Sequence, residues 1–312
     1  MNHERVTKER AADTADLDAY LPLLSEIGDL KRVRAAQLQD TVAAELFHRF
    51  WTELVDGAEP TAVARAGTAA ALCAARLGAV DAAVLSSGGL SDAESEEVLL
   101  AGFDAVASPL PEELRESLRG SVGELDLSPA HDGAPGFVRA LARQPRAGAT
   151  RPGQPRLMLE PPESHAEHCA TVAVYGVTLS GAFGADPGPV FVAGLAHHLH
   201  NAGLPDSGFT GEQLLGGYLD RVADRFRESA LAELPEASRK TAASSLNLTE
   251  NAESPEARAF HAADVLDRVL QMRNYERQAG FTLDQALEEM ELVHPGPLKD
   301  FQDAVLSRAG IR

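Results

Sequence analysis

The apolar pattern is the feature that most constrains this chain, because it repeats at helical spacing and lacks the alternating β-branched runs that strands need. Leu21, Leu24 and Ile27 recur every three residues, as expected of a helix face that packs on a core. Ala and Leu dominate the apolar residues, and aromatic residues make up only 5% of the chain. The sequence therefore predicts an all-α fold.

Capping signals locate several helix starts. In four places a Ser or Thr is followed three residues later by Glu or Gln, so that each side chain can satisfy a free backbone N–H group of the other. These pairs are Ser91/Glu94, Ser164/Glu167, Thr210/Gln213 and Thr282/Gln285. Asp186 before Pro187 and Ser254 before Pro255 indicate two further starts. In the first half, the pattern predicts helices over 17–34, 38–55, 61–77, 91–107 and 111–118.

The composition changes between residues 121 and 157, where prolines, glycines and arginines accumulate around one short predicted helix at 137–143. Such a segment is typical of an irregular linker. We therefore expect an N-terminal helical domain over 1–120, a Pro/Gly-rich linker over 121–157 and a C-terminal helical domain over 158–312.

Charge and composition exclude several classes of protein. The chain has 28 Lys+Arg against 47 Asp+Glu, for a net charge of −19, which disfavours nucleic acid as a partner. Cys73 and Cys169 are too few for a disulfide framework or a thiolate zinc cluster. Residues 1–10 are polar, and no run of 18 apolar residues occurs, so we expect no signal peptide, no membrane partner and a cytoplasmic location.

Metal-capable side chains recur three residues apart on three predicted helices of the second half. The pairs are His165/His168, His197/His200 and His261/Asp264, with His198 next to His197. Residues at this spacing share a helix face and can direct two ligands at one ion. An apolar run at 190–196 precedes His197, and a buried imidazole needs a partner such as a metal ion. The alternative for any single pair is a solvated helix face, and His165 is expected to be exposed at the first helical position.

Three segments resemble the HD superfamily of metal-dependent phosphohydrolases: 167–173 its first helix, 193–198 its His-Asp signature and 262–267 its closing Ala-Asp helix. The resemblance covers about residues 160–275 and predicts an HD-like helical bundle in the C-terminal domain. It implies three metal ligands, His168, His197 and Asp264.

His198 stands where this superfamily has the aspartate of its His-Asp dyad. A carboxylate can bridge two metal ions, whereas an imidazole offers one nitrogen to one ion. The substitution therefore predicts one divalent transition metal (Fe, Mn, Zn or Ni) held by three nitrogens and one oxygen. The expected ligands are His168, His197, His198 and Asp264.

The resemblance also implies residues that contact the substrate. A nucleotidase-like branch carries acids three and eight residues after the dyad, which correspond to Asn201 and Asp206. Asp206 can act as a general base, whereas Asn201 can only bind. Arg156 and Arg151 lie where that branch holds phosphate with an arginine. His261, on the face of Asp264, is a second candidate for moving the proton.

These features favour a metal-dependent hydrolase of a phosphate ester or nucleotide-like small molecule, whose substrate is anionic. Two alternatives stay open. The chain could be an HD-type mononuclear iron oxygenase, since three nitrogens and one carboxylate leave open positions on iron. It could also be a catalytically inactive signalling or scaffolding module, as a homodimer formed through its N-terminal helices. The literal His131-Asp132 dipeptide lies in Pro/Gly-rich sequence and is interpreted as a coincidence.

Overall fold

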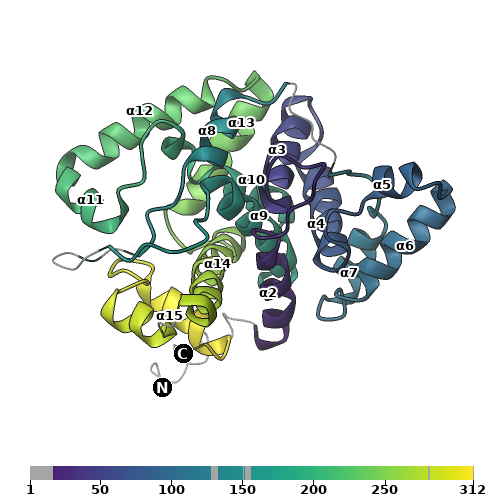
Figure 1. Ribbon diagram of the computed structural model, residues 1–312. Helices are drawn as coiled ribbons and strands as arrows, with labels where there is room; N and C mark the ends of the chain where they lie inside the picture. Colours follow the sequence, from purple (N-terminus) through teal and green to yellow (C-terminus); the bar gives the residue numbers. More distant parts are fainter. Residues whose placement is uncertain (1–16, 128–132, 150, 152–155, 280–281, 312) are drawn as a thin grey trace, which may run out of the picture.

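The computed structural model describes residues 17–127, 133–149, 151, 156–279 and 282–311 (Figure 1). These residues form helices joined by turns and contain no strand, so the predicted all-α fold is confirmed. Two isolated β-bridges occur, one between Pro145 and Ser164 and one between Ala149 and Leu157. No helix in the described ranges combines the length and apolar composition needed to cross a bilayer.

The helices of the first half follow the predicted ranges closely, with two differences. The first helix is shorter than 17–34: a 3-10 turn at Asp18–Tyr20 leads into a helix that ends at Asp29. A short helix that the pattern did not predict follows Asp81, whose side chain accepts a hydrogen bond from Val84 N–H. The helices are α2 (Leu21–Asp29), α3 (Val42–Val55), α4 (Pro60–Leu77), α5 (Ala82–Ser87), α6 (Asp92–Asp104) and α7 (Glu112–Arg119).

The second half contains eight helices within the described residues. They are α8 (Gly136–Arg143), α9 (His165–Phe183), α10 (Pro187–Ala196), α11 (Gly208–Leu215), α12 (Leu219–Leu231), α13 (Glu236–Leu246), α14 (Pro255–Ala279) and α15 (Lys299–Arg308).

Most of the predicted caps form. Ser91/Glu94 and Ser164/Glu167 form complete capping boxes, in which each side chain accepts from the backbone N–H of the other residue. Thr282 and Gln285 make the same two hydrogen bonds. The Thr210 cap was wrong: α11 begins at Gly208, two residues earlier, so Thr210 lies within its first turn.

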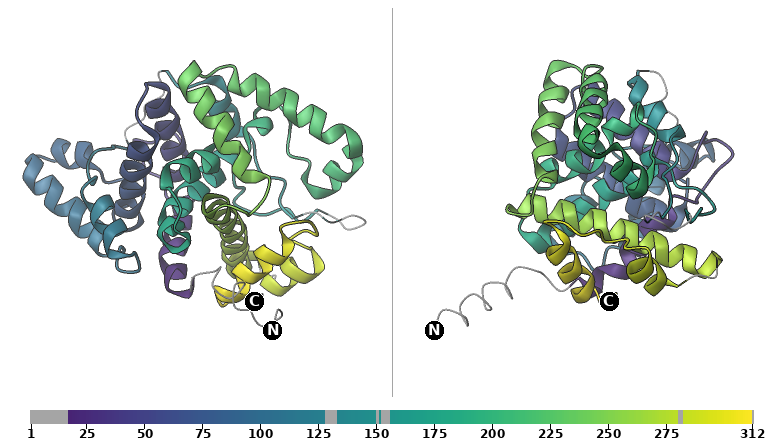
Figure 2. Two further views of the ribbon diagram at one scale, coloured as in Figure 1. Left: turned by 180° about the vertical axis from the view of Figure 1, so that it is seen from behind. Right: turned by 90° about the vertical axis from the view of Figure 1, so that its left-hand side faces the viewer.

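Helix α9 lies at the centre of the molecule, and every residue from His165 to Ser180 is buried. A helix that is apolar all round must be covered on all sides, and α3, α10 and α14 pack against it. Figures 1 and 2 show α5–α7 projecting on one side and α11–α13 on the other, with α9, α10 and α14 between them.

One hydrophobic core joins the two halves of the chain. A single cluster of buried apolar side chains runs from Leu17 to Ala309 and includes residues of α2, α3 and α4 as well as α9, α10 and α14. The N-terminal half is therefore packed directly on the helices that carry the predicted metal ligands. The domain boundaries at residues 120 and 157 stay a prediction.

Candidate metal centre

Three histidines and one aspartate from three helical segments meet at the centre of the second half. His168 comes from α9, His197 and His198 follow α10, and Asp264 comes from α14. One nitrogen from each histidine lies within 4.8 Å of the other two. Asp264 Oδ1 lies 3.3 Å from His168 Nε2 and 3.9 Å from His197 Nε2. The structure thus brings the three histidines together and places Asp264 next to His168 and His197.

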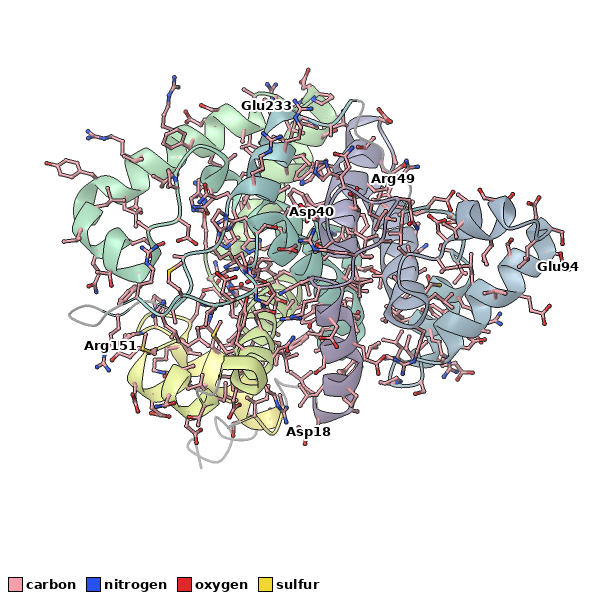
Figure 3. The ribbon with its side chains drawn as sticks, viewed as in Figure 1. Asp18, Asp40, Arg49, Glu94, Arg151 and Glu233 are labelled. Atoms are coloured by element: carbon pink, nitrogen blue, oxygen red, sulfur yellow. The ribbon has the colours of Figure 1, made fainter. Side chains whose placement is uncertain are left out.

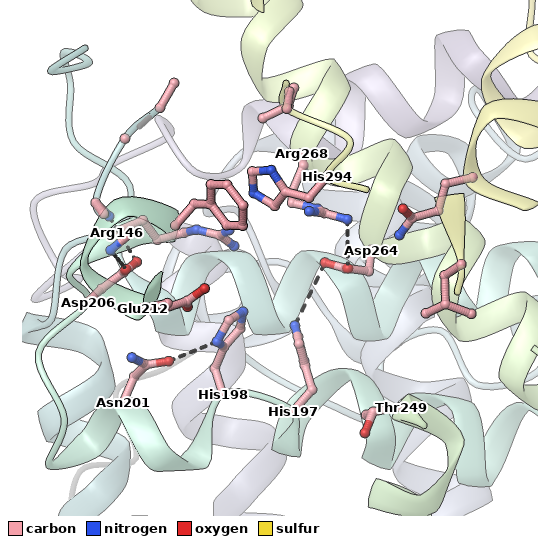
Figure 4. Close-up of a pocket in the computed structure, with 18 of the residues that line it drawn as sticks. Arg146, His197, His198, Asn201, Asp206, Glu212, Thr249, Asp264, Arg268 and His294 are labelled. Atoms are coloured by element: carbon pink, nitrogen blue, oxygen red, sulfur yellow. Dashed lines mark hydrogen bonds and ion pairs between the residues drawn. The ribbon is translucent and has the colours of Figure 1, made fainter. Parts of the chain in front are cut away.

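The two consecutive histidines reach the same space because the helix ends between them. Neighbouring residues in a regular α-helix do not share a face, and the sequence predicted one helix through 190–200. In the structure α10 ends at Ala196, His197 is its C-cap, and a 3-10 turn starts at Leu199. The rings of His197 and His198 therefore lie with centroids 4.3 Å apart, on one side of the chain (Figure 4).

Each of the three imidazoles is oriented by an oxygen at its Nδ1. His168 Nδ1 lies 2.7 Å from Asp267 Oδ2, His197 Nδ1 lies 2.8 Å from Gly194 O, and His198 Nδ1 lies 2.9 Å from Asn201 Oδ1. An acceptor at Nδ1 places the ring proton there, so that a neutral ring presents a lone pair at Nε2. The oxygen partners thus prepare three Nε2 atoms as ligands, as such partners do in metal sites.

The donor set fits a divalent transition metal. His168 Nε2 and His197 Nε2 lie 3.1 Å apart, and the Asp264 carboxylate faces both. A proton on one ring would satisfy one of these contacts, whereas a divalent cation satisfies all of them together. Two imidazole nitrogens on one tetrahedral Zn²⁺ lie about 3.3 Å apart, which is close to the separation found here. Nitrogen and carboxylate ligands of this kind suit Fe, Mn, Zn or Ni.

Burial favours the neutral forms of His197 and His198, and neighbouring cationic and hydrogen-bonding groups keep Asp264 charged. Burial, with help from the charge of His168, lowers the pKa of His197 to about 3. Burial likewise holds the pKa of His198 well below its ordinary value. For Asp264, burial acts to raise the pKa, but Arg268 and His168 lower it well below the ordinary range. His197, His198 and Asp264 are therefore deprotonated at neutral pH, as metal binding requires of them.

We expect the metal-free protein to lose stability as the pH falls from 7 to 5. The pKa of His197 is about 3 when folded and about 6.5 when unfolded. Between these values the unfolded chain binds a proton that the folded chain excludes, so the free energy of unfolding falls with pH by about 1–2 kcal/mol for this group. Urea unfolding in chelator at pH 7 and 5 measures this effect. The His197→Gln variant should show a weaker pH dependence, and equal slopes would contradict the assignment.

Three of the four candidate ligands, His197, His198 and Asp264, line a cavity of about 370 Å³ (Figure 4). Two arginines, Arg146 and Arg268, line the same cavity. Arg268 Nη2 lies 3.2 Å from Asp264 Oδ2, while its Nε is buried with no hydrogen-bond partner among the described residues. Arg146 Nη1 is likewise buried without a partner in the part of the chain that the structure describes. Buried guanidinium N–H groups without acceptors indicate a site for an anion.

The cavity also contains three other predicted site residues. Asn201 Oδ1 accepts a hydrogen bond from His198 Nδ1, and its Nδ2 donates to Leu204 O. Asn201 therefore orients the candidate ligand His198. Asp206 accepts backbone N–H groups from Ala147 and Gly208. Burial acts to raise the pKa of Asp206, but its bonds, led by that of His165, lower it far below the ordinary value.

His261 is the third of these residues. It is buried in the cavity wall, and its Nε2 lies 3.1 Å from Asn251 O. Since a carbonyl only accepts, that Nε2 carries the proton and Nδ1 retains its lone pair.

The arginines predicted to bind phosphate do not line this cavity. Arg156 is exposed and donates to Ser207 O, and Arg151 lies at the periphery, where it donates to Glu289 O (Figure 3). The expected exposure of His165 was wrong: it is 0% exposed, because α8 and the segment around Asp206 cover the start of α9, and its Nε2 lies 3.4 Å from Asp206 Oδ2. His131 and Asp132 lie outside the described residues.

Four residues at this site were missed by the sequence predictions. Asp267 stands three residues after Asp264 on α14, so its spacing was a usable signal. Arg268 follows Asp264 by four residues and was detectable in the same way. Arg146 and Lys31 come from distant segments, and no local pattern marks them.

Comparison with known proteins places this site within a described family. A family model described as HD domain matches residues 138–302. The match spans more than half of the chain, includes the 160–275 segment that carries the resemblance, and starts inside the predicted linker. Searches of curated proteins and of solved structures give no match.

Proposed function

Because the chain belongs to the family of HD-domain proteins, we propose that it is a metal-dependent hydrolase of a small phosphate ester such as a nucleotide. Members of the family are typically metal-dependent phosphohydrolases. The observation that carries the proposal is the convergence of His168 Nε2, His197 Nε2 and Asp264 Oδ1 beside a cavity that two arginines line.

The metal would be held by His168, His197, His198 and Asp264. When bound, it supplies Lewis acidity for the phosphoryl group and lowers the pKa of water. The resemblance implies that His198 takes the position of the family's bridging aspartate, and with a histidine there the site would suit one ion rather than two. The ring–oxygen bonds to Asp267, Gly194 and Asn201 keep these ligands in place.

The two arginines of the cavity would bind the phosphate group. The N–H fork of a guanidinium matches two phosphate oxygens, and a buried fork loses little binding energy to solvent screening. The buried Arg146 Nη1 and Arg268 Nε could each donate a hydrogen bond to a phosphate oxygen. These residues, rather than Arg156, are therefore our candidates for the anion site. Their positive charges also offset the net charge of −19 where an anionic substrate must approach.

His261 is the better of the two candidates for accepting a proton. A general base works best when its pKa lies near the working pH, whereas the pKa of Asp206 is far below its ordinary value. His261 retains a lone pair at Nδ1 when its Nε2 donates to Asn251 O, although burial lowers its pKa. Asp206 would instead hold the backbone at Ala147 and Gly208 in the cavity wall.

The proposal predicts release of inorganic phosphate from one or more members of a nucleotide and sugar-phosphate panel when Mn²⁺, Fe²⁺, Zn²⁺ or Ni²⁺ is added. Chelator should abolish the release. The Arg146→Met variant should raise KM about 10- to 100-fold, the range of a lost charge-assisted bond, with a smaller effect on kcat. The Arg143→Met variant serves as the matched control, since Arg143 is exposed on α8 and does not line the cavity.

Metal-loaded protein that releases no phosphate from the panel would count against the proposal. Oxygen consumption by iron-loaded protein without phosphate release would favour the oxygenase alternative. A protein that binds none of these metals, with an unfolding temperature unchanged by chelator, would favour the inactive module.

A further inference from the structure

A lysine from the N-terminal half is buried behind the metal centre. Lys31 lies in the turn after α2, and its side chain is 3% exposed. Its Nζ lies 2.6 Å from Asp267 Oδ1 on α14 and 2.5 Å from Glu163 Oε1, just before α9. A lysine is almost never fully buried unless it is paired, so these two carboxylates account for its position.

Asp267 connects this lysine to a candidate metal ligand. Its Oδ1 accepts from Lys31, and its Oδ2 accepts from His168 Nδ1, 2.7 Å away. Both oxygens of the Asp267 carboxylate are therefore hydrogen-bonded, Oδ1 to Lys31 and Oδ2 to His168. The opposite nitrogen of the same ring, His168 Nε2, faces His197 and Asp264. A continuous chain of short contacts therefore runs from the N-terminal half through Asp267 to the candidate metal centre.

The ammonium group takes the place that a second cation could otherwise fill. Glu163, His168 and Asp267 are close enough together to hold a metal ion, but Lys31 Nζ bonds both carboxylates of this group. Burial alone would lower the pKa of Lys31, whereas Asp267 and Glu163 raise it above its ordinary value. The lysine is therefore charged and neutralises carboxylates that would be costly to bury alone.

We propose that Lys31 is a positioning residue of the metal centre, which acts through Asp267 to fix the ring of His168. This inference rests on the proposed function. Without the ammonium, Asp267 loses the contact that holds its Oδ1, and the carboxylate is free to turn away from His168 Nδ1. The imidazole then loses the partner that sets its tautomer and its direction. Loss of such an outer partner typically weakens metal binding about 10- to 100-fold.

Titration of the full-length protein with Co²⁺, a spectroscopic substitute for Zn²⁺, tests this inference. We expect Lys31→Met to raise the Kd for Co²⁺ about 10- to 100-fold and to change the visible ligand-field bands. The matched control is Arg32→Met, which removes a neighbouring cation from the same interface, where Arg32 Nη2 bonds Gln271 Oε1 on α14 at 2.6 Å. This control should keep the wild-type Kd and bands.

If Lys31→Met does not fold, the Lys31→Met/Asp267→Asn double variant replaces it. Because that variant also removes the direct partner of His168 Nδ1, its binding is compared with that of Asp267→Asn alone. If Lys31 acts only through Asp267, the two variants should fold and bind Co²⁺ equally weakly, whereas a further loss in the double variant would contradict the inference. Wild-type Kd and bands in the folded lysine variant, or an equal loss in Arg32→Met, would overturn this inference alone. A wild-type protein that binds no Co²⁺ would overturn the proposed function, and this inference with it.

Discussion

Replacement of His197 by alanine is expected to reduce metal-dependent phosphate release about a thousandfold. His197 supplies one of the two Nε2 atoms that lie 3.1 Å apart, and its Nε2 also faces Asp264. A metal contributes several kcal/mol of charge stabilisation to a phosphoryl transition state, and each 1.36 kcal/mol corresponds to a factor of ten in rate. Phosphate release and bound metal, measured on the same purified sample, should fall together.

The fold itself should survive this change. His197 lines the cavity at the end of α10, so truncation to alanine enlarges an existing cavity and opens no void inside the apolar core. In chelator, the unfolding temperature of His197→Ala should stay near that of the wild type. His48→Gln is a suitable control, because His48 lies on α3 and does not line the cavity. Full activity of His197→Ala with added metal would rule out this residue as a ligand.

Substitution of Gly194 by alanine is expected to destabilise the protein and disturb the metal centre together. A Cβ at Gly194 would lie 2.6 Å from Ala173 Cα and 2.7 Å from Ala173 N, which are backbone atoms of α9 that cannot turn aside. Overpacking of this kind costs about 1–3 kcal/mol or more, and the better helix propensity of alanine returns about 1 kcal/mol. We expect a net loss of about 2 kcal/mol in the free energy of unfolding.

The same variant should bind metal more weakly. The carbonyl of Gly194 accepts the bond from His197 Nδ1, so a forced separation of α9 and α10 moves this acceptor and the histidine after it. Gly217→Ala is the matched control, since nothing lies within 4 Å of a Cβ there. Urea unfolding and Co²⁺ titration of both variants measure the two effects. A Gly194→Ala protein with wild-type stability would show that the two helices can separate without cost.

Much of the fold and part of the site followed from local patterns. Helix periodicity and capping chemistry predicted the all-α class and the starts of α9, α10 and α14, because a cap depends on residues within one turn. The convergence of His168, His197 and Asp264 was expected from the resemblance to the HD superfamily and not from local spacing. The exposure predicted for His165 was wrong because a local pattern does not report what other segments cover.

Local sequence was enough to specify the helices, their starts and the ligand types, since these depend on neighbours within a few residues. Which distant side chains complete the site depends on the folded arrangement of the helices. Lys31 lies 236 positions from Asp267, and Arg146 reaches the cavity from the segment predicted as a linker. Contacts at such separations arise only when the core that joins α2 to α9 and α14 has formed, because burial, rather than local spacing, forces those charges to pair.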